Sequence, residues 1–137
     1  MVNFKLSPHF CINEFVRTST GLQRENESYF FMDSIFLVRA SQIAFMLEWI
    51  RCSIFLPISI NSAFRCPNVN KAVGGVSKSD HLRMLAVDVA CSDMPLLRKY
   101  LQCWPFSDFV RCTIDHGTYI HISFKNFTTL SYQLCLN

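Results

Sequence analysis

The longest periodic pattern in the chain lies between residues 34 and 54. Apolar side chains there recur at spacings of three and four, which places them on one face of an α-helix. They are Ile35, Val38, Ile43, Met46, Leu47 and Ile50. Asp33 or Ser34 can cap the start of such a helix, because a short polar side chain accepts a hydrogen bond from a free backbone N–H group. We therefore predict one long helix, with Pro57 beyond its end.

Four shorter segments show the alternation and the β-branched content that are typical of β-strands. They are residues 58–64, 85–90, 106–114 and 118–124. Asp115, His116 and Gly117 separate the last two segments, and the glycine can take the positive φ of a tight turn. We predict that these two strands form an antiparallel hairpin.

Further helical signals are short. Near the N-terminus, Ser7 or Asn13 can cap a short helix. One helical turn is expected over residues 69–73, inside a loop that is otherwise rich in turn residues. Ser92 or Asp93 can cap a helix that follows the second strand. Strands packed on helices indicate an α+β fold, which we expect to be a single domain over residues 1–137, with a small, mainly antiparallel sheet packed against helices.

Composition narrows the class of protein. A chain of 137 residues that is half hydrophobic can build one modest core. The net charge is +3 and the basic residues are scattered, so we expect no nucleic-acid partner. No window of 18 residues is apolar throughout, so we expect no membrane span. We expect a monomer.

The chain has seven cysteines, and no pair of them is separated by two residues. An odd number without such a pair disfavours a disulfide framework or a structural zinc knuckle, and favours a reducing compartment. The first ten residues contain no apolar core of a secretory signal. We therefore expect a protein that is made in a cytoplasm.

A candidate metal centre comes from the last three strands. Asp88 lies within an apolar strand, His81 lies just before it, and His121 alternates with Ile120 and Ile122 on the final strand. If the hairpin lies beside residues 85–90, Asp88 and His121 meet. Two imidazoles and one carboxylate form a normal catalytic zinc shell. On spacing alone, Asp88 can instead face solvent or pair with an arginine.

Several motifs resemble one family, and they follow the family's order along nearly the whole chain. They are "SAFRCP" at residues 62–67, "NKAVGG" at 70–75, "SDHLRMLAVD" at 79–88 and "IHIS" at 120–123. Together they resemble the signature of the M15 peptidases, which include zinc D-Ala-D-Ala carboxypeptidases and phage peptidoglycan peptidases. The opening "LSPHFCINEF" is similar to the start of the phage-type members. The resemblance implies a fold like that of DD-peptidases and Hedgehog-type domains.

The resemblance also implies roles for particular residues. His81, Asp88 and His121 fall at the positions of the ligands of one zinc ion. Arg65 falls where the family has an arginine near the scissile carbonyl, and a guanidinium there can stabilise an oxyanion. Ser79 falls at a substrate-binding position. The alternatives are a structural ion pair for Arg65 and a loop-capping hydroxyl for Ser79.

Two positions depart from the family pattern. Met84 replaces a glycine three residues after the first ligand, and we expect it to perturb the turn that carries His81. Thr118 replaces an acidic general base, and a hydroxyl of ordinary pKa cannot take its place. The candidate base is therefore Asp115, with His116 second, although an Asp-His-Gly sequence is also what a tight turn requires.

The predicted function is that of a zinc-dependent metallopeptidase that hydrolyses peptide bonds in peptidoglycan stem peptides, as a carboxypeptidase or an endopeptidase. The resemblance implies a phage-encoded lysis or virion-associated enzyme, made in the bacterial host cytoplasm and acting on the cell wall after lysis or assisted export. One alternative is a catalytically impaired peptidoglycan-binding module that keeps the zinc fold. The other is an interaction protein without metal, in which His81 and Asp88 only pair.

Overall fold

The computed structural model describes residues 3–126. Along the chain, the helices and strands follow in one series: α1 (Ile12–Val16), α2 (Gln23–Phe30), α3 (Ser34–Ile54), β1 (Ser59–Ser62), α4 (Pro67–Ala72), η1 (Asp80–Arg83), β2 (Ala86–Ala90), α5 (Met94–Leu101), η2 (Ser107–Phe109), β3 (Val110–Asp115) and β4 (Ile120–Phe124). One hydrophobic core joins them.

A four-stranded antiparallel sheet forms the centre of the fold, with the strand order β1-β2-β4-β3. The predicted hairpin is β3 and β4, and Gly117 in its turn has the expected positive φ of 85°. β4 also pairs with β2, so the last of the described strands lies inside the sheet. The predicted α+β fold with a small antiparallel sheet is confirmed.

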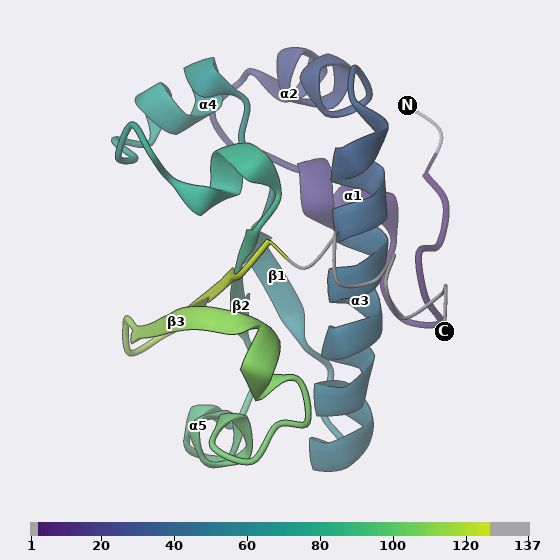
Figure 1. The fold of residues 1–137 in the computed structure, drawn as a ribbon, viewed down its shortest axis with the longest axis vertical. Helices are drawn as coiled ribbons and strands as arrows, with labels where there is room; N and C mark the ends of the chain where they lie inside the picture. Colours follow the sequence, from purple (N-terminus) through teal and green to yellow (C-terminus); the bar gives the residue numbers. More distant parts are fainter. Residues whose placement is uncertain (1–2, 127–137) are drawn as a thin grey trace.

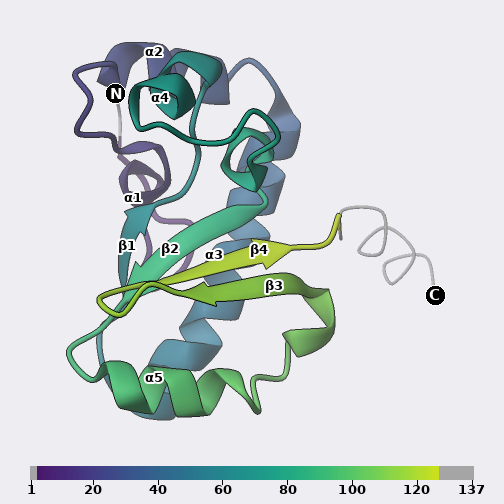
Figure 2. The same ribbon diagram turned by 90° about the vertical axis from the view of Figure 1, so that its left-hand side faces the viewer.

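The long helix is α3, and its bounds match the prediction. The Asp33 carboxylate accepts a hydrogen bond of 3.0 Å from the Ile35 N–H and caps its start. Figure 2 shows α3 crossing behind the sheet, while α5 lies below the strands and α1, α2 and α4 lie above them. The sheet therefore buries one face against α3, and its other face lies on the side away from α3 (Figure 1).

The N-terminal segment is fastened to α3 through one carboxylate. Glu48 accepts hydrogen bonds of 2.7 Å from the Ser7 hydroxyl and from the His9 N–H, and its other oxygen lies 2.8 Å from the His9 imidazole. Burial alone would raise the pKa of Glu48, but these hydrogen bonds outweigh burial and hold the pKa below its ordinary value. The segment before α1 is thus held against the middle of the long helix.

Some local predictions were wrong or incomplete. Residues 107–109 form the short helix η2 rather than the start of a strand. Helix α2 was not predicted, and it has few buried residues. The expected helical turn is the six-residue helix α4. Cys11 is the residue at the start of α1, and neither Ser7 nor Asn13 takes that place.

Among residues 3–126, no single helix is long and apolar enough to cross a membrane. Helices α2 and α3 taken together would be long and apolar enough, but they meet at a bend of 97°. The six cysteines in this part of the chain are free, and Cys135 lies outside the described residues.

Candidate metal centre

The sheet register places Asp88 of β2 directly opposite His121 of β4. Side chains alternate between the two faces of a strand. Ile120 and Ile122 therefore enter the core, with 2% and 0% of their surface exposed, while His121 lies on the open face. The predicted meeting of Asp88 and His121 is confirmed, because His121 Nδ1 lies 2.8 Å from Asp88 Oδ1.

His81 reaches the same carboxylate from η1, the short helix before β2. Its Nε2 atom lies 3.4 Å from Asp88 Oδ1. The Ser79 hydroxyl caps this helix by accepting a hydrogen bond of 3.3 Å from the His81 N–H. His81 is buried, with only 2% of its surface exposed, so the position of η1 fixes that of its imidazole.

Met84 ends η1 in the left-handed conformation, with φ of 52° and ψ of 39°. This conformation is the reason a glycine suits the position, since a side chain there crowds the following carbonyl. The turn nevertheless forms, and the Met84 side chain is fully buried in the core. Met84 thus keeps the left-handed turn that carries His81.

Atoms of His81, Asp88 and His121 that can bind a metal all lie within 4.8 Å of one another. The nitrogen of each imidazole that faces away from Asp88 already has a partner. His81 Nδ1 lies 2.6 Å from the Ala63 carbonyl oxygen, and His121 Nε2 lies 2.7 Å from the Ser123 hydroxyl. Such partners orient the imidazoles of metal sites. Two imidazoles and one carboxylate suit zinc.

The electrostatics of the group favour an ionised Asp88. Burial alone would raise the pKa of Asp88, but hydrogen bonds from His121 and His81 outweigh burial and hold the pKa far below its ordinary value. Arg65 lies on the other side of the carboxylate, with Nη2 3.5 Å from Asp88 Oδ2 and with Nε donating a hydrogen bond of 3.0 Å to the Ser62 hydroxyl. Burial lowers the pKa of Arg65, and Asp88 opposes that change.

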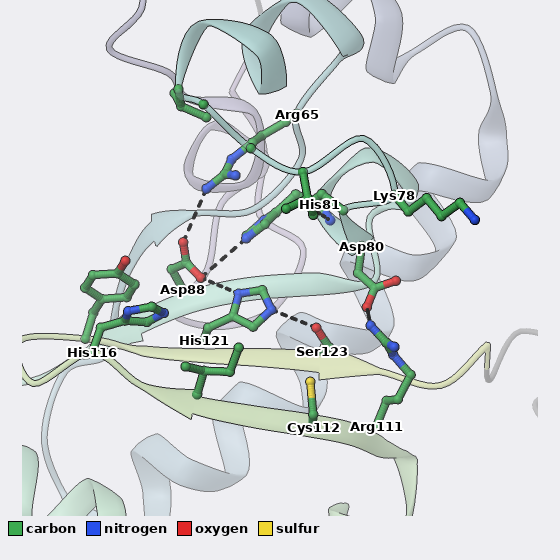
Figure 3. Close-up of a pocket in the computed structure, with 17 residues that line it drawn as sticks. Arg65, Lys78, Asp80, His81, Asp88, Arg111, Cys112, His116, His121 and Ser123 are labelled. Atoms are coloured by element: carbon green, nitrogen blue, oxygen red, sulfur yellow. Dashed lines mark hydrogen bonds and ion pairs between the residues drawn. The ribbon is translucent and has the colours of Figure 1, made fainter.

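A cavity of about 490 Å³ lies over this group (Figure 3). Arg65, Ser79 and His116 line it together with the three candidate ligands. The cavity therefore brings together six of the seven residues predicted to form the site.

Asp115 does not line this cavity. It is the last residue of β3, and its carboxylate pairs with Arg98 of α5 and accepts a hydrogen bond of 2.8 Å from the Gly117 N–H. The hydrogen bond from Arg98 is the main cause that holds the pKa of Asp115 below its ordinary value. The structure thus places Asp115 at the end of β3, with its carboxylate paired to Arg98 of α5. His116 instead lies at the cavity and stacks on Tyr119, with 4.6 Å between ring centroids.

Several residues at the cavity were not singled out from the sequence. Asp80, Arg111 and Tyr119 belong to this set. Asp80 directly precedes a candidate ligand, which was a usable signal. Tyr119 lies two residues before His121, so strand alternation places it on the same face. The position of Arg111 follows from the hairpin register, and nothing in its local sequence indicates it.

A family model described as peptidase M15 matches residues 8–123. Neither the curated proteins nor the solved structures contained a match to the chain. The matched residues include all those that surround the cavity.

Proposed function

Because the chain belongs to the peptidase M15 family, we propose that it is a zinc-dependent metallopeptidase that cleaves an amide bond in peptidoglycan stem peptides. The observation that carries the proposal is the His81–Asp88–His121 group, whose ligand atoms lie within 4.8 Å of one another beside a cavity. The motif resemblance supports peptidoglycan as the substrate. The similarity of the N-terminal motif to phage-type members supports a phage-encoded lysis or virion-associated enzyme.

The three ligand positions would hold zinc through His81 Nε2, the Asp88 carboxylate and His121 Nδ1. When bound, zinc would activate water and polarise the scissile carbonyl. The protein's own contribution is orientation, since Ala63 and Ser123 fix the two imidazoles through their second nitrogens.

Arg65 is the group best placed to stabilise negative charge on the substrate. It lines the cavity next to Asp88, and its Nε atom is held by Ser62. A guanidinium that is fixed before the reaction stabilises an oxyanion without reorganising. Ser79 also lines the cavity, and we propose that its hydroxyl contacts the substrate while it caps η1.

His116 is the group that we propose transfers the proton. The cavity has two lining carboxylates among the described residues, Asp80 and Asp88. Asp80 is paired with two arginines and Asp88 belongs to the candidate metal group. Asp115 is held away by Arg98. His116 is the remaining candidate at the cavity, and an imidazole is the side chain that most often transfers protons in enzymes.

Release of muropeptides from purified sacculi tests the proposal. We expect release that requires zinc, stops with a chelator and falls at least about a hundredfold in His116→Ala, the usual loss when a general base is removed. Asp115→Asn, at the neighbouring residue, is the matched control and should keep most of the activity. Loss of activity in Asp115→Asn with full activity in His116→Ala would reverse the two roles.

The absence of a free carboxylate among the described cavity residues favours one second candidate, a zinc-containing module that binds peptidoglycan without cleaving it. One zinc ion per chain, binding to sacculi and no released product would establish that module. A chain that binds no zinc would contradict both functions.

A further inference from the structure

A buried carboxylate lies next to the candidate metal group without belonging to it. Asp80 directly precedes His81 in η1, and only 1% of its side chain is exposed. Its two oxygens accept hydrogen bonds from Arg83 and from Arg111. A buried carboxylate is costly unless it is paired, so these arginines make its position possible.

The two arginines come from different parts of the fold. Arg83 lies three residues after Asp80 in the same short helix. Arg111 lies in β3, and Figure 3 shows its side chain rising from that strand toward Asp80. Of the two ion pairs, the pair with Arg111 alone joins η1 to the sheet. η1 carries His81, and β3 pairs with the strand that carries His121.

A second link runs through Ser123 of β4. Its hydroxyl lies 2.7 Å from His121 Nε2. Hydrogen bonds from Arg83, Arg111 and Ser123 together outweigh the effect of burial and hold the pKa of Asp80 below its ordinary value. Asp80 is therefore adjacent to one histidine along the chain and is connected to the other through a hydroxyl.

We propose that Asp80 and Arg111 form a positioning pair that fixes His81 and His121 at the separation required for metal binding. The inference rests on the proposed function, because it concerns the affinity of the same metal centre. The pair acts between two segments that no continuous strand joins, η1 and the hairpin. Neither residue belongs to the candidate metal group, so we assign both as positioning residues.

Arg111→Met and Arg83→Met form a matched test. Each removes one positive charge and one partner of Asp80, and the two side chains are 57% and 56% exposed. Only the first removes the ion pair between η1 and the sheet. The zinc dissociation constant is measured by competition with a chromophoric chelator. We expect about tenfold weaker binding for Arg111→Met, the lower end of the usual effect of residues that support metal ligands. Arg83→Met leaves the ion pair between Arg111 and Asp80 in place, so its zinc dissociation constant should stay close to that of the wild type.

Asp80→Asn supplies a double-mutant cycle. If the two residues act as one pair, Asp80→Asn combined with Arg111→Met binds zinc about as weakly as Asp80→Asn alone. Additive losses would overturn the proposal. So would a higher KM in Arg111→Met with unchanged zinc affinity, because that result makes Arg111 a substrate-binding residue. Unchanged zinc affinity in Arg111→Met overturns this inference alone, whereas a wild type that binds no zinc overturns the proposed function as well.

Discussion

Replacing Met84 by glycine separates two opposing effects in the turn that carries His81. Met84 has φ of 52°, and this left-handed conformation costs a residue with a side chain roughly 1–2 kcal/mol. Its side chain is also fully buried, and truncating a buried methionine costs roughly 2–5 kcal/mol. The loss of packing exceeds the relief of strain. We therefore expect Met84→Gly to lower the free energy of unfolding by about 2 kcal/mol.

Met84→Ala is the control, because it loses the same packing and keeps the strain. Glycine is normally less stable than alanine by roughly 0.5–1 kcal/mol in regular structure. At this position the order should reverse, with Met84→Gly more stable than Met84→Ala by about 0.5–1 kcal/mol. Urea denaturation measures all three proteins, with chelator present so that metal binding does not add to stability.

Two results would refute this reasoning. A Met84→Gly variant as stable as the wild type would mean that the buried side chain contributes no more than the strain removes. A Met84→Ala variant more stable than Met84→Gly would mean that the left-handed backbone costs little here. The second result would also remove the reason for a glycine at this position.

Three further predictions concern the loop after α4, the N-terminal segment and the candidate metal centre. Gly75→Ala should lower the free energy of unfolding by about 1–3 kcal/mol in urea denaturation, because the added Cβ would lie 2.0 Å from the buried Asn70 Oδ1. Unchanged stability would show that Asn70 moves aside. Glu48 has a lowered pKa in the folded protein, so its stabilising contribution is complete above its unfolded pKa near 4.3 and is lost as the pH falls through the folded pKa. Glu48→Gln should therefore make the melting temperature less sensitive to acid. An identical dependence of the melting temperature on pH in the two proteins would contradict the link between Glu48 and His9. Zinc at about a hundred times its dissociation constant should raise the free energy of unfolding of the wild type by about 2.7 kcal/mol. The same zinc concentration should stabilise Asp88→Ala much less. Equal stabilisation of the two proteins would place the metal elsewhere.

Much of the fold follows from local pattern. The long helix from Ser34 and the alternation around His121 were predictable, because each shows in the spacing of apolar residues within a single helix or strand. The meeting of Asp88 with His121 was a conditional prediction, since it requires that β4 pair with β2. The sequence pattern shows which face of a strand is apolar, and it leaves the choice of neighbouring strand open.

The parts that were not predicted depend on tertiary contacts. Asp115 has the carboxylate that a general base needs. Its carboxylate pairs with Arg98 of α5 and so lies outside the cavity, and the sequence around Asp115 does not indicate this pairing. Arg111 looked like a scattered surface charge until the register brought it to Asp80. Short helices such as α2 bury few side chains, so their apolar period is weak.

The position of β4 inside the sheet has a consequence for the order of events during synthesis. β2 emerges from the ribosome before β3 and β4, yet its partner on one side is β4. A nascent chain that ends before residue 120 therefore carries His81 and Asp88 but lacks the strand that completes the sheet between β2 and β3. Domains generally fold as units during synthesis. The three candidate ligands can thus come together only after β4 has been synthesised, later than the strand that carries Asp88.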